Sequence, residues 1–154
     1  RPALQGARLN SFELINDGFD ITLISDTMVG HIMKKGLVDK VLVGADRITK
    51  DGYVFNKIGT YQVALLAKKH NIPFYPVAPV STFDFKNEWQ DIEIEERDKN
   101  EIIQIKGNHI APKNVKVFNP AFDATPPELI TGIITNKGIL HKPYKKSIAK
   151  LRET

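Results

Sequence analysis

Three short runs of apolar, β-prone residues constrain the fold of this chain more than any other feature: residues 21–24, 41–43 and 74–78. None of the runs alternates between apolar and polar side chains, so both faces of each strand are expected to be covered. Segments with helical spacing separate the runs, which is typical of an α/β protein with a parallel sheet between helices. The 154 residues are enough for one such domain. Pro76 favours a place near an edge of the sheet for the third run.

Apolar residues recur at helical spacing in three segments, which we expect to be helices: residues 9–16, 26–35 and 58–70. Each segment is followed within a few residues by a glycine or a proline, which commonly ends a helix. The helices would connect the three apolar runs as in a right-handed crossover between parallel strands.

The second half of the chain is less regular. Residues 92–95 alternate like a half-exposed strand, and residues 115–118 are a further strand candidate. A helix is predicted to begin at Thr125, because a proline follows at the first helical position and Glu128 completes a capping box. Gly138 would end that helix.

The composition excludes several classes of site. The chain contains no cysteine, and therefore no disulfide framework, thiolate metal site or cysteine nucleophile. Its four histidines lack metal-ligand spacing, and neither Ser25 nor Ser81 lies in a GxSxG motif. No apolar run approaches the ~18 residues of a membrane span, and no secretory signal opens the sequence. We expect a soluble, cytoplasmic protein.

The net charge is +4, and much of the excess lies in the tail at residues 141–152. We interpret this tail as a solvated helix or a frayed end rather than a nucleic-acid-binding arm, because Tyr144 alone offers little aromatic stacking. The sequence starts at Arg1-Pro2 without a methionine and enters a helical segment at once. We expect an N-terminal portion to be missing; tag removal or processing is the alternative.

Asp46 is the strongest candidate for proton-transfer chemistry. It follows the apolar run 41–43 in the motif Gly44-Ala45-Asp46, and ligands of parallel sheets bind beyond the carboxyl ends of the strands. A carboxyl group beside a buried strand has a raised pKa unless it is paired, and this suits general acid–base catalysis. The alternative is a structural role, as an ion pair with Arg47 or a cap on the following turn.

A candidate phosphate-binding segment lies at residues 56–60, at the start of the predicted third helix. Free amides and the helix dipole favour an anion there. Lys57 adds a positive charge, and Asn56 and Thr60 add hydrogen-bonding groups. An ordinary polar helix cap is the alternative.

Two further polar segments are open to a structural or a functional interpretation. Asp123 could be a second carboxylate at the site, although we favour a role in holding the turn before the predicted helix at Thr125. Residues 94–98 carry a charged cluster, which we interpret as a salt-bridged loop.

Five segments occur in the order found in the methylthioribose-1-phosphate isomerases: RPALQGARL, VGADRI, NKIGTY, IEERD and NPAFDATPPELI. The chain resembles this family over about residues 1–140. The wider superfamily includes the regulatory subunits of translation initiation factor 2B and the ribose-1,5-bisphosphate isomerases. GAD and NKIGT are shared across that superfamily, whereas the arginine after GAD and the IEERD segment are more particular to the methylthioribose enzymes.

The resemblance implies that residues 1–154 are a single Rossmann-like C-terminal domain, an α/β three-layer sandwich with a mainly parallel sheet. A smaller helical N-terminal domain, absent from this chain, would complete the active-site cleft. The resemblance makes Asp46 the general acid/base and gives substrate contacts to Gln5, Asn56 and Lys57. It also implies a catalytic cysteine and phosphate-binding arginines in the N-terminal half. Either these groups lie on a missing segment or a second chain, or the protein is not a complete enzyme.

The implied reaction converts 5-methylthioribose 1-phosphate to 5-methylthioribulose 1-phosphate in methionine salvage, by an enediol or a hydride-shift route. It requires no metal and no organic cofactor. The implied partners are the sugar-phosphate substrate, the N-terminal half of the same protein and a second copy in a homodimer; neither a membrane nor a nucleic acid is expected. The alternatives are a non-enzymatic regulatory subunit like those of initiation factor 2B, and a ribose-1,5-bisphosphate isomerase.

Overall fold

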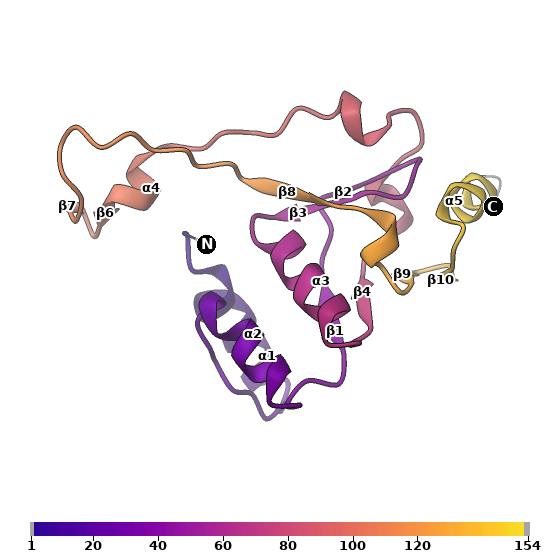
Figure 1. The fold of residues 1–154 in the computed structure, drawn as a ribbon, viewed down its shortest axis with the longest axis horizontal. Coiled ribbons are helices and arrows are strands. Elements are labelled where there is room, and N and C mark those ends of the chain that lie inside the picture. The colour runs from indigo at the N-terminus through magenta and orange to yellow at the C-terminus, as the bar shows by residue number, and fades with distance from the viewer. Residues whose placement is uncertain (1, 153–154) are drawn as a thin grey trace.

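The structure, a computed structural model, describes residues 2–152, which form a mixed α/β fold (Figure 1). Two parallel strands lie at its centre, β1 (Val41–Val43) and β4 (Phe74–Pro76), and their residues pair in register. These are two of the three strands predicted from apolar runs. Leu42 of β1 is 64% exposed, so β1 is only half covered rather than buried on both faces.

Beyond β4 the sheet continues through a parallel bridge from Val77 to Ile134. Ile134 belongs to β9 (Ile133–Thr135), which forms an antiparallel hairpin with β10 (Gly138–Leu140). The central sheet is therefore small and mixed rather than mainly parallel.

The prediction of a helix that begins at Thr125 is wrong. Thr125 is the last residue of a strand, β8 (Phe122–Thr125), and only the short 3-10 turn η5 (Pro127–Leu129) follows it. Thr125 pairs with Val54 across the sheet and is fully buried, and the backbone returns to an extended conformation at Ile130 after the 3-10 turn. Sheet pairing outweighs the local capping signal, because burial in tertiary contacts contributes more than one cap.

A second sheet has the strand order β5-β2-β3-β8. β3 (Val54–Lys57) is antiparallel to both β2 (Arg47–Thr49) and β8, whereas β2 is parallel to β5 (Phe83–Asp84). The sequence patterns did not predict β2 or β3. These strands matter for the site, because β3 ends at the residues Asn56 and Lys57.

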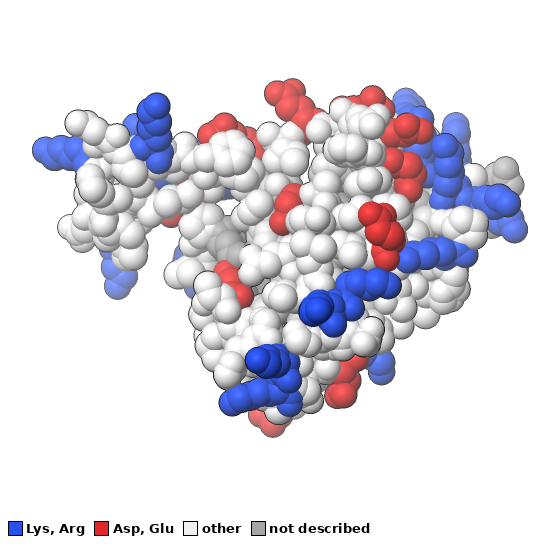
Figure 2. Space-filling model, in the orientation of Figure 1, with Lys and Arg blue, Asp and Glu red and all other residues white. Residues whose placement is uncertain are grey.

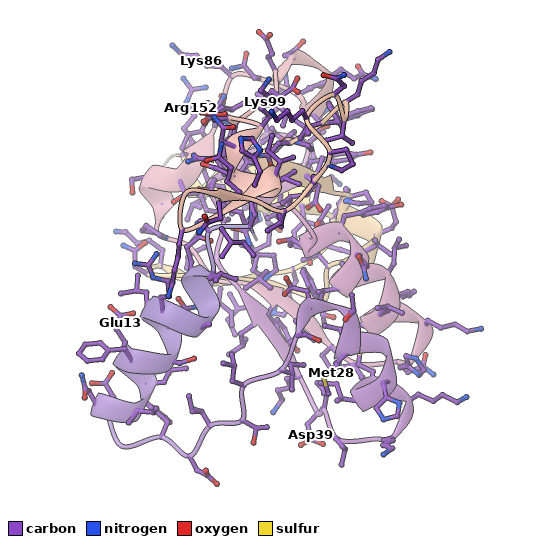
Figure 3. The ribbon with its side chains drawn as sticks, turned by 90° about the vertical axis from the view of Figure 1, so that its left-hand side faces the viewer. Glu13, Met28, Asp39, Lys86, Lys99 and Arg152 are labelled. Carbon is purple, nitrogen blue, oxygen red and sulfur yellow. The ribbon has the colours of Figure 1, made fainter. Side chains whose placement is uncertain are left out.

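The three helices predicted in the first half of the chain are present. The first is a π-helical turn, η1 (Gly6–Asn10), continued by α1 (Ser11–Asn16). The second is η2 (Asp26–Met28) followed by α2 (Val29–Lys34), and the third is α3 (Thr60–Lys69). Figure 3 shows α1 standing apart from the packed pair α2 and α3. Among the described residues, no helix is both long and apolar enough to cross a membrane.

Three predicted strands are not formed: residues 21–24, 92–95 and 115–118. The segment at 92–95 is followed only by an isolated bridge at Glu96, and no strand of the described residues pairs with the other two segments. A strand is stable only with a hydrogen-bonded neighbour, so apolar, β-prone sequence is not sufficient. Leu23, in the first segment, is 61% exposed.

Residues between β5 and β8 form an arm that extends away from the body of the molecule (Figure 1). Near its tip, α4 (Asn100–Ile103) leads into a hairpin of β6 (Gln104–Ile105) and β7 (Asn108–His109). Two further 3-10 turns are η3 (Val80–Thr82), which precedes β5, and η4 (Trp89–Asp91), which lies at the start of the arm.

The basic tail is not only a solvated helix. It forms α5 (Tyr144–Leu151), whose Tyr144, Ile148 and Leu151 side chains are buried. Its charged side chains lie outside, and Figure 2 shows Lys and Arg gathered at this end of the molecule. The buried Tyr144 hydroxyl donates a hydrogen bond to the Ile130 carbonyl at 3.1 Å.

One hydrophobic core joins the two sheets, α3 and α5. Its most deeply buried members come from six different elements and the loop before β9; they include Ile48, Val54, Ala64, Phe74, Ile130, Ile133 and Ile148. This shared core fixes the ends of β1 and β3 relative to one another, and the candidate site lies at those ends.

Candidate active site

Four side chains that the resemblance assigns to the site line one cavity of about 570 Å³: Gln5, Asp46, Asn56 and Lys57. Gln5 comes from the turn before η1, Asp46 from the loop after β1, and the other two from the end of β3. The cavity therefore lies beyond the carboxyl end of β1, as expected for a ligand site of a parallel sheet. The other lining residues are Gly6, Asn10, Leu42, Val43, Gly44, Thr60, Val63 and Val77.

A backbone hydrogen bond fixes the position of Asp46, and burial and a neighbouring charge change the pKa of its carboxyl group. Its amide donates a 2.8 Å hydrogen bond to the Phe55 carbonyl, which ties the loop after β1 to β3. The side chain is more exposed than its sequence position suggested. Even so, partial burial raises the pKa of the Asp46 carboxyl, and the positive charge of Lys57 partly offsets that rise. The alternative role of Asp46, as the ion-pair partner of Arg47, is not observed: Arg47 pairs with Asp84 at 3.1 Å.

Asn56 and Lys57 are anchored at the junction of β3 and α3. The Asn56 side-chain amide donates to the Thr60 hydroxyl at 3.1 Å, and that hydroxyl donates to the Lys57 carbonyl at 2.7 Å. Thr60 is almost fully buried, so this small network is shielded from water. Sequence reasoning proposed Thr60 only as a possible ligand of an anion, whereas here it braces its neighbours.

The Lys57 ammonium lies 5.0 Å from the centre of the Phe122 ring, within the range of a cation–π contact. Phe122 is the cross-strand partner of Lys57 in the β3–β8 pair. The aromatic ring gives the long lysine side chain a fixed surface to lie on. No local feature of the sequence indicated this contact.

The amides at the start of α3 already have an anionic partner within the protein. The Asp123 carboxylate accepts hydrogen bonds from the Gly59 amide at 2.6 Å and the Tyr61 amide at 3.0 Å. The preceding amide, of Ile58, donates to the Ala121 carbonyl at 3.0 Å. The Gly59 and Tyr61 amides are therefore not available to a phosphate, because an internal carboxylate accepts both hydrogen bonds. Asp123 is likewise not a brace for a following helix.

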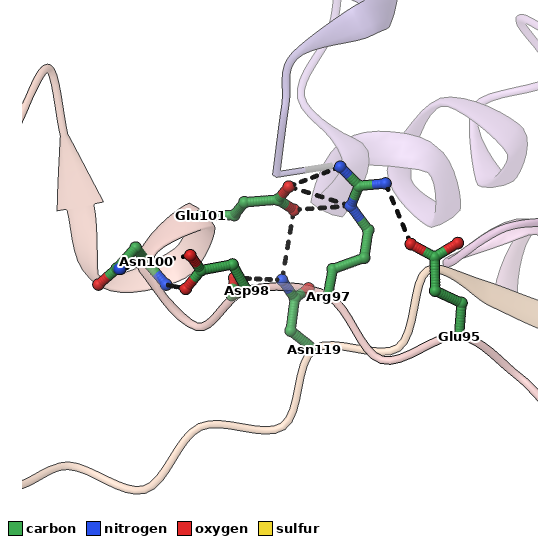
Figure 4. A network of polar contacts seen from close by, with 6 residues as sticks. All are labelled: Glu95, Arg97, Asp98, Asn100, Glu101 and Asn119. Carbon is green, nitrogen blue, oxygen red and sulfur yellow. Dashed lines mark hydrogen bonds and ion pairs between the residues drawn. The ribbon is translucent and has the colours of Figure 1, made fainter.

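The charged cluster at residues 94–98 is a salt-bridged loop, as predicted (Figure 4). The Arg97 guanidinium binds the Glu101 carboxylate at 2.7 Å and approaches Glu95 at 3.5 Å. The hydrogen bond from Arg97 lowers the pKa of Glu101. Buried Asn119 donates to Glu101 at 3.3 Å and to the Asp98 carbonyl at 3.0 Å, so it fastens the base of the arm.

Among the described residues, no group of three or more His, Asp or Glu side chains could hold a metal ion. The chemistry that this cavity offers is that of a carboxyl group with a raised pKa beside an ammonium group and the side-chain amides of Gln5, Asn10 and Asn56. Such a set can donate or accept a proton and bind the hydroxyl groups of a sugar.

Comparison with known sequences gives close relatives. The chain is 60% identical to the methylthioribose-1-phosphate isomerase of Carboxydothermus hydrogenoformans over 98% of its own length and 44% of the relative. It is 58% identical to the enzyme of the same name from Thermosipho melanesiensis, over 99% of the chain and 44% of the relative. The chain thus spans less than half the length of these curated relatives.

Solved structures agree with the fold. The crystal structure of 5-methylthioribose 1-phosphate isomerase from Pyrococcus horikoshii superposes with a TM-score of 0.95 at 48% identity, over 99% of this chain and 43% of that one. The crystal structure of the translation initiation factor eIF-2B, subunit delta, from A. fulgidus gives a TM-score of 0.96 at 54% identity, over 100% of this chain and 45% of that one.

Some of these relatives are therefore named as isomerases, and one is named as an initiation-factor subunit. A family-wide match covers both, since residues 1–142 fit the family described as the initiation factor 2 subunit family. The chain belongs to the initiation factor 2 subunit family.

Proposed function

We propose that this chain supplies part of the active site of a methylthioribose-1-phosphate isomerase, with Asp46 as the general acid/base. The observation that carries the proposal is the convergence of Gln5, Asp46, Asn56 and Lys57 on one cavity. Relatives at 58–60% identity that bear the isomerase name support the same assignment.

The proposed substrate, 5-methylthioribose 1-phosphate, carries its phosphate on the anomeric carbon and cannot open as a free aldose does. The ring oxygen must receive a proton, and a hydrogen must then move from C2 to C1. Asp46 suits the proton transfer, because its raised pKa brings the protonated form closer to neutral pH. Asn56 and Lys57 would bind hydroxyl or phosphate oxygens of the sugar, and Gln5 would close the cavity from the other side.

Part of this site must come from elsewhere under the proposal. Asp123 accepts the hydrogen bonds of the Gly59 and Tyr61 amides, so these two amides are not free to bind the substrate phosphate. We place the principal phosphate ligands and the expected cysteine on the N-terminal half of the protein, which would complete the cleft. The exposure of Asp46 is consistent with a second segment covering it.

The same proposal extends to the fold and the assembly. The parallel pair β1 and β4 would be the core of a Rossmann-like three-layer domain covering residues 1–154, with a mainly parallel sheet in the complete protein. Leu42 on β1 and Leu23 in the unpaired segment 21–24 are more than 60% exposed, which supports further strands at that edge. A cytoplasmic homodimer is part of the proposal.

The test is turnover of two substrates by the full-length protein. We expect conversion of 5-methylthioribose 1-phosphate and a much lower kcat/KM for ribose 1,5-bisphosphate. The reverse preference would assign the protein to the bisphosphate isomerases. Binding of a sugar phosphate with turnover of neither substrate would favour a regulatory subunit, the class of protein for which the A. fulgidus structure is named.

A further inference from the structure

Asp123 connects two parts of the candidate site that are far apart in the sequence. It lies on β8, directly opposite Asn56 of β3, and its neighbour Phe122 lies opposite Lys57. Its two carboxylate oxygens accept hydrogen bonds from the amides of Gly59 and Tyr61, residues 64 and 62 positions earlier in the chain. β8 is thus joined both to β3, by the strand ladder, and to the start of α3, by this carboxylate.

We propose that Asp123 is a positioning residue of the sugar-phosphate site: its carboxylate fixes the start of α3 and thereby the side chains of Asn56 and Lys57. The inference rests on the proposed function for its catalytic consequence. The positioning itself is a property of the protein without substrate, so it can be tested separately.

The first path runs from Asp123 to Asn56. The carboxylate holds the amides on either side of Thr60, which is the first residue of α3. The Thr60 hydroxyl then accepts the hydrogen bond from the Asn56 side-chain amide at 3.1 Å. Because Thr60 is only 2% exposed, water does not readily replace either contact.

The second path runs to Lys57. The same Thr60 hydroxyl donates to the Lys57 carbonyl at 2.7 Å, which sets the direction in which the lysine leaves β3. Phe122, held in register by β8, supports the lysine ammonium at 5.0 Å from the ring centre. If the start of α3 shifts, both supports of Lys57 change together.

The geometry requires a carboxylate at this position. Two amide donors point at Asp123, and an ionised carboxylate offers an acceptor to each of them. An asparagine offers one acceptor and turns its own N–H₂ group towards the other donor. The negative charge also suits the positive end of the ten-residue helix α3. Gly59 adopts φ 98°, a left-handed conformation that other residues take only with strain, and the carboxylate bond to its amide secures this turn.

The experiment compares Asp123→Asn with Asp91→Asn in the full-length protein. Asp91 is a matched control, because its carboxylate also accepts a helix-start amide, that of Glu88 at 2.8 Å, but no residue of the turn that it holds lines the cavity. Thr60→Val keeps the side-chain volume but removes the hydroxyl that bonds the Asn56 side chain and the Lys57 carbonyl. For each variant we would measure Tm, kcat and KM, and the Asp46 titration by carbon-detected NMR, with Asp46→Asn spectra for assignment.

The titration separates positioning from a simple change of charge. Lys57 lowers the pKa of Asp46, so displacement of Lys57 in Asp123→Asn would raise that pKa. Loss of a nearby negative charge alone would lower it instead. We expect the rise in both Asp123→Asn and Thr60→Val, and no change in Asp91→Asn. An Asp46 pKa that is unchanged or lower in Asp123→Asn and Thr60→Val would overturn the proposal.

The kinetics test the consequence for catalysis. We expect kcat/KM for 5-methylthioribose 1-phosphate to fall about tenfold to a hundredfold in Asp123→Asn, since misplacement of about 1 Å has effects of this size. Values within about twofold of wild type would also overturn the proposal. If the wild-type protein turns over neither sugar phosphate while the pKa still rises, the proposed function fails and the positioning role stands.

Discussion

The charge of Asp46 depends on two opposing influences. Partial burial raises the pKa of its carboxyl, and the Lys57 ammonium lowers it. Such a balance keeps an acid/base near a useful pKa while leaving it responsive to its neighbour. Lys57 therefore has two proposed roles, as a ligand of the sugar phosphate and as the group that limits the rise in the Asp46 pKa.

Removal of the Lys57 charge should therefore shift the pH profile. In Lys57→Gln of the full-length protein, the attraction that favours ionised Asp46 is lost, so the limb of the kcat/KM profile that reports Asp46 should move to higher pH. Lys69→Gln, at the far end of α3, removes the same charge outside the cavity and should leave the limb in place. A limb that moves to lower pH in Lys57→Gln contradicts these roles of Lys57.

Residues with local signals could be predicted from the sequence, and residues with distant partners could not. Asp46 was found because it follows an apolar run, and Asn56 and Lys57 because they precede a helix. The contacts of Asp123 join residues more than 60 positions apart in the sequence, and no local sequence pattern around Asp123 predicts them. The resemblance supplied Gln5, which carries no physical signal of its own.

Helices and strands also differ in this way: elements with a local signal could be predicted, and elements that depend on a distant partner could not. The helices formed close to their predicted positions, because spacing of apolar residues along one helix is a local property. The segment after Thr125 has a strong helix-start signal, yet its backbone is used in the pairing of β8 with β3. Short strands depend on such distant pairing, so β2, β3 and β8 could not be located from composition and periodicity alone.

α5 provides a test at this scale. The Tyr144 hydroxyl is buried and bonds the Ile130 carbonyl, and burial raises the pKa of Tyr144 to about 12. Tyr144→Phe should lower the free energy of unfolding by about 1–3 kcal/mol, because it leaves that carbonyl without its donor. Tyr61→Phe, where the ring is 40% exposed, should change it by less than about 0.5 kcal/mol in the same denaturant titration. Equal effects of the two variants would show that α5 is not held by this bond.

At the scale of the whole molecule, several large apolar side chains are exposed. Leu42, Leu23 and, on α1, Phe12 are each more than 60% exposed. Where such side chains lie together, they mark a surface that another segment covers. Since the chain spans about 44% of its curated relatives, the remainder of the protein is the natural candidate to cover them.

Hydrogen exchange should reveal that covering. Amides of residues 21–24 form no strand in this chain, and we expect them to exchange at least about tenfold more slowly in the full-length protein, where a neighbouring strand would pair with them. Amides within α3 should be protected in both forms. Equally fast exchange of 21–24 in the full-length protein would refute the proposed extension of the sheet.

The most direct test of the central claim is the turnover of 5-methylthioribose 1-phosphate by full-length Asp46→Asn. Asparagine keeps the size of the side chain and loses the titrating proton, so kcat should fall by about 10²- to 10⁴-fold. Asp39→Asn, an exposed carboxylate on the loop before β1 and outside the cavity lining, should retain wild-type turnover (Figure 3). Near-normal turnover by Asp46→Asn would contradict the assignment of Asp46 as the acid/base.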